Sequence, residues 1–263
     1  MAGRLSDLSP QEVASAIERN YVEAYRVLAV SYPGAHIIDR PDLFAFATGE
    51  ETSLGNCIVQ SFLDDDDASR VIDETLAYFN GRNLKTAWST SASTTPAALP
   101  SLLIAAGGRE VDMPAMAADL TELPSVVHPS QVHEVLDEVE NQVWLQLMPP
   151  SFRTLLLRVT EKFGLGPESP MRNFIAYLNG EPVATSSLIV AGGEAGIYCV
   201  GTAPEARRQG IGAAVTLKAM AAAKEMGFGI IGLQSSKMGL PVYQRLGFRE
   251  YGRIKHYVFN EEP

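Results

Sequence analysis

A β-prone run, a glycine-bearing loop and a helical segment follow one another between Ala195 and Gly227, and this stretch constrains the fold most. Ile197–Thr202 leads into Arg207–Gly212, and Ala213–Met226 contains no glycine or proline, so it is expected to be helical. The start of a helix leaves backbone N–H groups without intrahelical partners, and its dipole is positive there. The loop glycines let a ligand approach the backbone because they have no Cβ. The stretch therefore predicts a site for an anionic group such as phosphate.

The spacing of the loop differs from two other phosphate-binding motifs. The dinucleotide fingerprint needs G-x-G-x-x-G directly after the strand and the P-loop needs G-x-x-x-x-G-K-[ST], and this loop has neither. It contains Arg207-x-x-Gly210-x-Gly212, which resembles the acetyl-coenzyme-A signature of the GNAT superfamily of N-acetyltransferases. Ile230–Ser236 looks like the next strand of that family, and Gly239–Phe248 looks like its short tyrosine-bearing helix. The resemblance extends over roughly the last third of the chain.

The resemblance implies roles for individual residues. Amides of the loop and of the first helical turn would hold the pyrophosphate, and main-chain groups of the preceding strand would align the pantetheine arm. Tyr243 stands where the family commonly has the acid that protonates the departing thiolate; the alternative is a packed aromatic side chain with a satisfied hydroxyl. The two arginines are either phosphate ligands or solvated surface. The cofactor-binding residues predicted in this way are Cys199, Val200, Thr202, Arg207, Arg208, Gln209, Gly210, Ile211, Gly212, Ala213 and Ser235.

The net charge of −10 is confined to the first half of the chain. Met1–Leu123 contains 8 Lys and Arg against 18 Asp and Glu, whereas Pro124–Pro263 contains 13 of each. Pro124–Ser130 is the predicted link, so we expect domains at residues 1–123 and 124–263. A nucleic-acid-binding protein usually has a basic patch, and the sequence suggests none. The acidic half is expected to serve mainly solubility.

The first half is predicted to begin with a long helix and to continue as short strands and helices. Ser9-Pro10-Gln11-Glu12 is a capping box, and apolar residues at helical spacing follow it to about Val30. Strands are expected at Ala35–Asp39, Leu43–Thr48, Asn56–Phe62, Leu84–Ser89 and Val111–Leu120, with helices at Ala68–Phe79 and from Thr95-Pro96 onward.

The same order of elements recurs in the second half, so we predict a mixed α/β fold of two tandem GNAT-like acyltransferase domains. The first copy carries Asp64–Asp67 where the second carries its glycine loop. Four carboxylates would repel a pyrophosphate, so this copy is expected to be degenerate and not to bind the cofactor. We expect the aspartates to cap a helix rather than to bind calcium, because the alternating ligands of an EF-hand loop are missing.

The second half is predicted to open with a strand and two helices. They are Val132–Leu136, a helix capped by Asp137, and Phe152–Phe163, followed by a hairpin around Asn179-Gly180. In the family the helix pair overhangs the acceptor pocket. Four of its residues therefore either face a substrate or belong to ordinary helix surface and core: Glu138, Glu140, Asn141 and Trp144.

The sequence does not assign a general base. The carboxylate on the strand before the loop is Glu194, at the end far from the loop, and a bound water, Glu138 or Glu140 are alternatives. Cys199 is interpreted as a small core residue rather than a nucleophile. The histidines lack the spacing of a triad or metal site and are expected to be structural, and no metal is predicted: His36, His128, His133 and His256.

Two functions of different classes remain. One is an acetyl-coenzyme-A-dependent N-acetyltransferase that acts on a primary amine of a small molecule or peptide. The alternative is a non-catalytic acyl-coenzyme-A-binding regulatory module. With two cysteines, no signal-peptide pattern and no apolar run near the roughly 18 residues of a membrane span, we expect a cytoplasmic protein without nucleic-acid or membrane partners. Family analogy alone suggests a homodimer.

Overall fold

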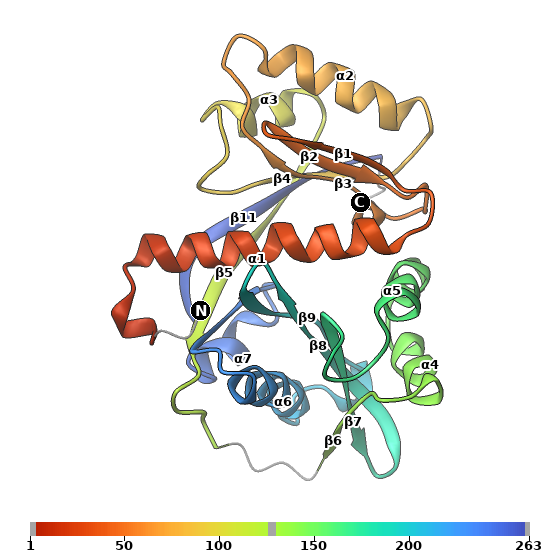
Figure 1. The fold of residues 1–263 in the computed structure, drawn as a ribbon, viewed down its shortest axis with the longest axis vertical. Helices are drawn as coiled ribbons and strands as arrows, with labels where there is room; N and C mark the ends of the chain where they lie inside the picture. The colour runs from red at the N-terminus through yellow and green to blue at the C-terminus, as the bar shows by residue number, and fades with distance from the viewer. Residues whose placement is uncertain (1–3, 126–129, 261–263) are drawn as a thin grey trace.

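The computed structural model describes residues 4–125 and 130–260. In this part of the chain, eleven strands form one mixed sheet and seven α-helices cover it (Figure 1). The first half contains α1 (Pro10–Ser31), β1 (His36–Arg40), β2 (Leu43–Ala47), β3 (Asn56–Ser61), α2 (Ala68–Asn80), β4 (Thr86–Thr90), α3 (Leu99–Ala105) and β5 (Arg109–Asp119). The second half contains β6 (Gln131–Glu134), α4 (Glu138–Gln146), α5 (Pro150–Phe163), β7 (Met171–Leu178), β8 (Glu181–Ala191), β9 (Glu194–Thr202), α6 (Ile211–Glu225), β10 (Ile230–Gln234), α7 (Leu240–Arg245) and β11 (Arg249–Phe259).

The two halves exchange their last strands. The order across the sheet is β1-β2-β3-β4-β11-β5-β10-β9-β8-β7-β6. The final strand of the first half, β5, therefore pairs with β10 of the second half, and β11 pairs with β4 of the first. β5 and β11 also pair with each other at the centre. Each half completes its sheet with a strand from the other half.

Each face of the sheet carries its own set of helices. One apolar cluster joins α1, α4 and α5 to one face and includes Tyr21, Trp144 and Ile254. Side chains that point to the other face form two clusters, one beneath α6 and α7 and one beneath α2 and α3. Met116 belongs to the first of these and Trp88 to the second. Burying a large apolar side chain contributes about 1.5–3 kcal/mol, so these clusters stabilise the packing of the helices on the sheet.

Helix α1 belongs to the first half but lies largely on the second (Figure 1). It packs against α5, β8, β9 and β10, as well as against both central strands. Its Asn20 donates hydrogen bonds to the carbonyls of Ile189 and Glu194 at 3.1 and 3.0 Å and accepts one from the Tyr198 hydroxyl at 2.8 Å. A buried amide with partners on β8 and β9 fixes the position of the helix, because leaving those groups unpaired would cost free energy.

Several local predictions are confirmed. Ser9 and Glu12 form the capping box of α1, and the Asp137 side chain accepts from the amide of Glu140 at the start of α4. Asn179 and Gly180 both have positive φ, as a tight hairpin turn between β7 and β8 requires. No helix in the described ranges is long and apolar enough to cross a bilayer.

Two local predictions were wrong. The aspartate run does not cap α2 through its side chains: Asp67 has helical backbone angles, φ −98° and ψ −17°, and its carboxylate pairs with Arg70. A capping residue needs an extended backbone to aim its oxygen at the helix amides. The helix expected from Thr95 begins only at Leu99, because Thr95 forms a bridge with Phe62 that keeps it extended. His128 and part of the predicted link, Pro124–Ser130, lie outside the described residues.

Candidate active site

Strands β9 and β10 separate halfway along their length. Their parallel pairing joins Gly196 to Gly232 and Ile197 to Leu233, while β9 continues to Thr202. The edge of β9 that faces β10 therefore has no strand partner beyond this point in the described chain. Main-chain donors and acceptors left on such an edge are open to a ligand.

A β-bulge lies where the strands separate. The β8–β9 register shifts at this point, and Cys199 has φ +53°. Its carbonyl accepts a hydrogen bond from Thr185 Oγ1 at 2.9 Å, which holds the bulge. Cys199 lies within β9 and packs against the apolar cluster beneath α1, which agrees with its interpretation as a small core residue. Burial raises the pKa of its thiol to about 11, so a thiol rather than a thiolate is present at neutral pH.

The loop after β9 presents the first turn of α6. Gly210 precedes the helix in the left-handed conformation, φ +85°, which a glycine adopts without strain, and no side chain caps the helix. The Ala214 amide donates to the Gly210 carbonyl at 3.1 Å, as the first hydrogen bond of a helix that begins here would. The amides of Ile211, Gly212 and Ala213 thus form the open positive end of the helix.

Side chains around the loop brace it. Arg207 Nε donates to the Thr202 carbonyl at 3.1 Å, and Gln209 Nε2 donates to the Glu205 carbonyl at 3.3 Å. A Cβ on Gly212 would lie 3.3 Å from Thr202 Oγ1, so the helix start approaches the end of β9 closely. Arg208 is exposed, with φ +61°. The structure thus brings the loop residues and the end of β9 together.

Tyr243 lies on α7 in the apolar cluster that contains Ile197, Ile211 and Leu233. Its ring is 7% exposed and stands edge-on to Phe248 at a centroid distance of 5.8 Å. Burial raises the pKa of its hydroxyl to about 12, so it keeps its proton at neutral pH. No hydrogen bond or charge contact of this hydroxyl is found among the described residues. The hydroxyl is therefore not satisfied within the described protein, unlike that of the packed tyrosine that was the structural alternative.

Ser235 is fully buried at the end of β10. Its amide donates to the Pro114 carbonyl and its hydroxyl donates to the Ser236 carbonyl, both at 2.9 Å. Its hydrogen-bond donors are therefore used within the protein.

The acceptor-side candidates differ in their surroundings. Glu138 and Glu140 are exposed on α4. Trp144 is fully buried, and Asn141 is buried and donates to Thr160 Oγ1 at 3.0 Å. The Trp144 indole nitrogen and Asn141 Oδ1 have no hydrogen-bond partner in the described structure. Both side chains are therefore part of the core beneath α4 rather than of an open acceptor surface.

The remaining titratable candidates take part in structural contacts. Glu194, at the start of β9, is buried and forms an ion pair with Arg19 of α1 at 2.7 Å. His256 Nε2 lies 3.0 Å from the Tyr21 hydroxyl, which also lies 2.8 Å from Ser89 Oγ. Within residues 4–125 and 130–260, no three His, Cys, Asp or Glu side chains gather as metal ligands would.

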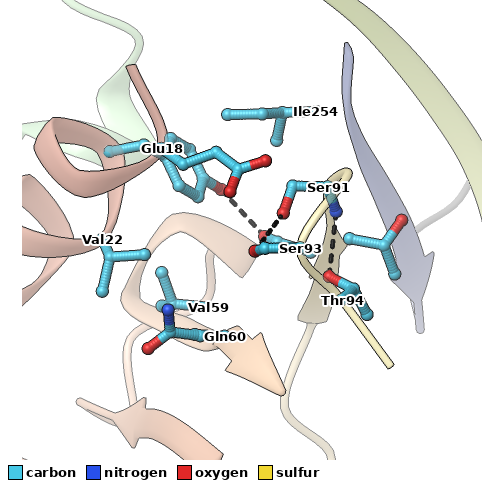
Figure 2. A pocket seen from close by; sticks show the side chains of 11 residues that line it. Glu18, Val22, Val59, Gln60, Ser91, Ser93, Thr94 and Ile254 are labelled. Atoms are coloured by element: carbon cyan, nitrogen blue, oxygen red, sulfur yellow. Dashed lines mark hydrogen bonds between the residues drawn. The ribbon is translucent and has the colours of Figure 1, made fainter. Parts of the chain in front are cut away.

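The corresponding gap between β3 and β4 in the first half is closed by protein. Trp88 Nε1 donates to Ser61 Oγ at 3.1 Å, and the backbone of Thr95 bonds to Ser61 and Leu63. A cavity of about 20 Å³ remains beside it, between Glu18 of α1 and the loop that contains Ser91, Ser93 and Thr94 (Figure 2). A space of this size holds about one water molecule.

Sequence reasoning missed the contribution of α1. Asn20 is a polar residue on the apolar stripe that contains Ile17 and Tyr21, and this placement was the available signal that the helix carries a buried hydrogen-bonding group. The bulge at Cys199 had no comparable signal, because β-propensity does not record the register of the neighbouring strand.

Comparison with known proteins agrees with this geometry. Residues 132–248 match the sequence profile of the acetyltransferase (GNAT) family, and the match contains the loop, α6 and Tyr243. The second half of the chain is thus similar in sequence to the GNAT acetyltransferase family. The search of curated protein sequences found no match.

Solved structures share the fold over nearly the whole chain. A GCN5-related N-acetyltransferase from Kribbella flavida superposes with a TM-score of 0.70 at 18% identity, over 93% of this chain and 96% of that one. One from Sphaerobacter thermophilus gives 0.62 at 15%, over 96% and 93%. A tandem GNAT protein from the clavulanic acid biosynthesis pathway gives 0.60 at 11%, over 97% and 98%. The fold is therefore that of GNAT acyltransferases.

Proposed function

We propose that this chain, whose residues 132–248 match the GNAT acetyltransferase family, is an acetyl-coenzyme-A-dependent N-acetyltransferase with its active site in the second half. It would transfer the acetyl group directly to a primary amine of a small molecule or peptide. One observation carries the proposal: the uncapped start of α6 lies against the end of β9, next to the edge that β10 leaves unpaired.

The start of α6 would hold the pyrophosphate. The amides of Gln209, Gly210, Ile211, Gly212 and Ala213 lie at the positive end of a helix of 15 residues that no side chain caps. A side chain on Gly212 would narrow the space between the helix and Thr202. Arg208 is exposed beside the loop and free to reach a phosphate, whereas Arg207 is already bonded to a main-chain carbonyl.

The unpaired edge of β9 would align the pantetheine arm. Cys199, Val200 and Thr202 follow the point at which β10 separates, so main-chain groups here can bond an extended amide-bearing ligand as another strand would. Ser235, at the end of β10, would form the opposite wall. These features fit acetyl-coenzyme A, which would supply an acetyl group activated as a thioester.

Tyr243 would act as the acid. Nitrogen of the neutral amine attacks the thioester carbon, the carbon–sulfur bond breaks, and the thiolate takes the tyrosine proton. With the pKa raised to about 12, the hydroxyl is protonated at neutral pH and has no competing partner in the described protein. The amine loses its proton to a base that we do not assign; Glu138 and Glu140 are accessible, whereas Glu194 is held in its ion pair.

We further propose that residues 1–123 form a degenerate copy that does not bind the cofactor and residues 124–263 the catalytic domain. The closed gap at Trp88 and the carboxylates at Asp64–Asp67 support this assignment. A homodimer and a cytoplasmic location stay predictions.

Calorimetric titration of acetyl-coenzyme A is the test. Gly210→Glu/Gly212→Glu should abolish binding. Gly212→Glu alone should weaken binding strongly, and its effect does not come from backbone strain, because Gly212 does not have a positive φ. The control is Lys218→Glu, which changes the net charge of the same helix equally at an exposed position and should bind as the wild type does.

A free-thiol assay across a panel of small amines and peptides then tests catalysis. Tyr243→Phe should lower kcat by about 10²-fold or more while leaving the affinity for acetyl-coenzyme A within about twofold, as loss of a general acid predicts. Tight binding with no amine-dependent thiol release would support the acyl-coenzyme-A-binding module instead. Wild-type protein that does not bind acetyl-coenzyme A would refute both functions.

A further inference from the structure

The first half contains a groove that the proposed acetyl transfer does not use. It has a volume of about 450 Å³ and lies between α2 and the β1–β2 hairpin. In Figure 1 α2 lies over these strands, at the end of the sheet opposite to β6. The groove is therefore remote from the α6 site along the sheet.

The two walls of the groove are a helix and an edge strand. One stripe of α2 lines it, from Asp67 through Val71 and Glu74 to Tyr78, at the spacing that places side chains on one helix face. Eleven residues of helix correspond to about 16 Å. The other wall includes Ile38 and Arg40 of β1. An extended peptide rises about 3.3 Å per residue, so about five residues would fill this length.

Strand β1 has an unpaired edge. It ends the sheet, pairing with β2 on one side only, and four of its five residues are exposed. An edge strand presents main-chain groups that an extended segment can pair with, and a helix beside such an edge supplies pockets for its side chains. The floor is apolar: Phe62 remains 37% exposed there although it is a large aromatic residue.

The charge of the groove is negative. Four carboxylates, Asp42, Asp64, Asp67 and Glu74, line it with two guanidinium groups. Both guanidinium groups are neutralised within the wall, because Arg40 pairs with Asp42 and Arg70 pairs with Asp67 and Glu74. The Asp64 carboxylate has no such pair among the described residues. A ligand that enters the groove thus meets an excess of negative charge above an apolar floor.

We propose that this groove binds an extended, lysine- or arginine-rich peptide segment as an added strand on β1. The aliphatic stems of the basic side chains would cover Phe62 and their charged ends would reach Asp64 and Asp67. The groove would thereby make a basic polypeptide a partner of the acidic half. The proposal goes beyond the acetyl-transfer function and does not depend on cofactor binding.

Fluorescence anisotropy with a labelled hexapeptide of alternating lysine and valine tests the proposal on the full chain. Asp64→Asn/Asp67→Asn should weaken binding about tenfold, and Asp64→Asn alone should weaken it measurably. Asp65→Asn/Asp66→Asn is the matched control, since it makes the same change in net charge in the same run at residues outside the groove, and binding should stay within about twofold. Thermal unfolding checks that each variant is folded.

A second probe tests the strand pairing. The hexapeptide with N-methylated valines keeps its charge but lacks those backbone donors, so it should bind at least about tenfold more weakly. The proposal would be overturned if the two peptides bound equally well, or if the wild type bound neither. It would also be overturned if the two aspartate double variants lost the same affinity, or if spermine at the same concentration of positive charge displaced the peptide. A concentration-dependent dimer that competes with the peptide would instead assign the edge to a second copy.

The peptide should bind the Gly210→Glu/Gly212→Glu variant as it binds the wild type. Wild-type protein that binds the peptide but not acetyl-coenzyme A would contradict only the enzymatic function, and wild-type protein that binds acetyl-coenzyme A but not the peptide would contradict only the groove.

Discussion

Asn20 of α1 and Gly196 of β9 are in such close contact that we predict a strong energetic coupling between them. A Cβ on Gly196 would lie 1.9 Å from Asn20 Oδ1 and 2.9 Å from the Tyr198 ring. Asn20 cannot rotate away without losing its hydrogen bonds to the carbonyls of Ile189 and Glu194. Gly196→Ala therefore forces both an overlap and the loss of buried hydrogen bonds between the two halves.

The magnitude follows from these contacts. Overpacking costs about 1–3 kcal/mol, and a buried group that loses its hydrogen-bond partner costs about 1–3 kcal/mol. We expect Gly196→Ala to lower the free energy of unfolding by about 4 kcal/mol. Asn20→Ala removes the same hydrogen bonds and leaves the Tyr198 hydroxyl unpaired, for a loss of about 3 kcal/mol. In the double variant the overlapping amide is gone, so the loss should be about 4 kcal/mol rather than the sum of the two.

Equilibrium urea unfolding of the four proteins measures this coupling, provided that circular dichroism and fluorescence give coincident transitions. A control cycle combines Gly196→Ala with Leu76→Ala, whose side chain lies in the core beneath α2, and should be additive. If the losses in free energy of unfolding caused by Asn20→Ala and Gly196→Ala add to within about 0.5 kcal/mol in the double variant, the Asn20 amide and a Cβ at residue 196 do not compete for the same space.

Two further predictions concern charged groups. Burial lowers the pKa of His256 to about 4; because this lies below its ordinary value of about 6.5, the unfolded chain takes up the proton first as the pH falls. The free energy of unfolding should then fall by about 3 kcal/mol between pH 6.5 and 4. In His256→Gln the urea midpoint should depend less on pH across this window. The same pH dependence in the variant as in the wild type would contradict the prediction. The Arg172 guanidinium donates two short hydrogen bonds to the Glu134 carboxylate at 2.7 and 2.6 Å. Glu134→Gln should therefore lower the free energy of unfolding in urea by about 3 kcal/mol, because it leaves the buried Arg172 without its charged partner. Arg253→Gln, which breaks an exposed pair with Asp112, should cost under about 1 kcal/mol, and equal losses would refute the argument from burial.

Local signals predicted most of the secondary structure. The capping box at Ser9, the Asp137 cap of α4 and the Asn179-Gly180 turn are short-range features, so the sequence around them suffices. The glycine loop and the helix after it were predicted for the same reason. Tyr243 could be placed on a short helix, but its unpaired hydroxyl depends on side chains from other elements.

Long-range arrangement could not be predicted in this way. The exchange of β5 and β11 depends on which strand edge each one meets, and hydrophobic periodicity is the same for either partner. The position of α1 across β8 and β9 depends on one buried amide, Asn20. Asp67 likewise has helical backbone angles, which its neighbours along the chain impose, so its side chain cannot cap the helix although aspartate favours that position.

The equivalent positions of the two gaps are the reason why we propose a coenzyme site in the second half and none in the first. In the second half the last paired residues of the separating strands are Ile197 and Leu233, and in the first half they are Ile58 and Trp88. The Leu233 side chain lies within the core beneath α6. The Trp88 side chain, at the equivalent position, reaches across the gap to Ser61 and fills the gap. An open gap leaves main-chain groups of β9 without partners, which is costly unless a ligand or water binds them. The closed gap satisfies its own groups, so the first half can provide α1 and β5 as a rigid frame for the second.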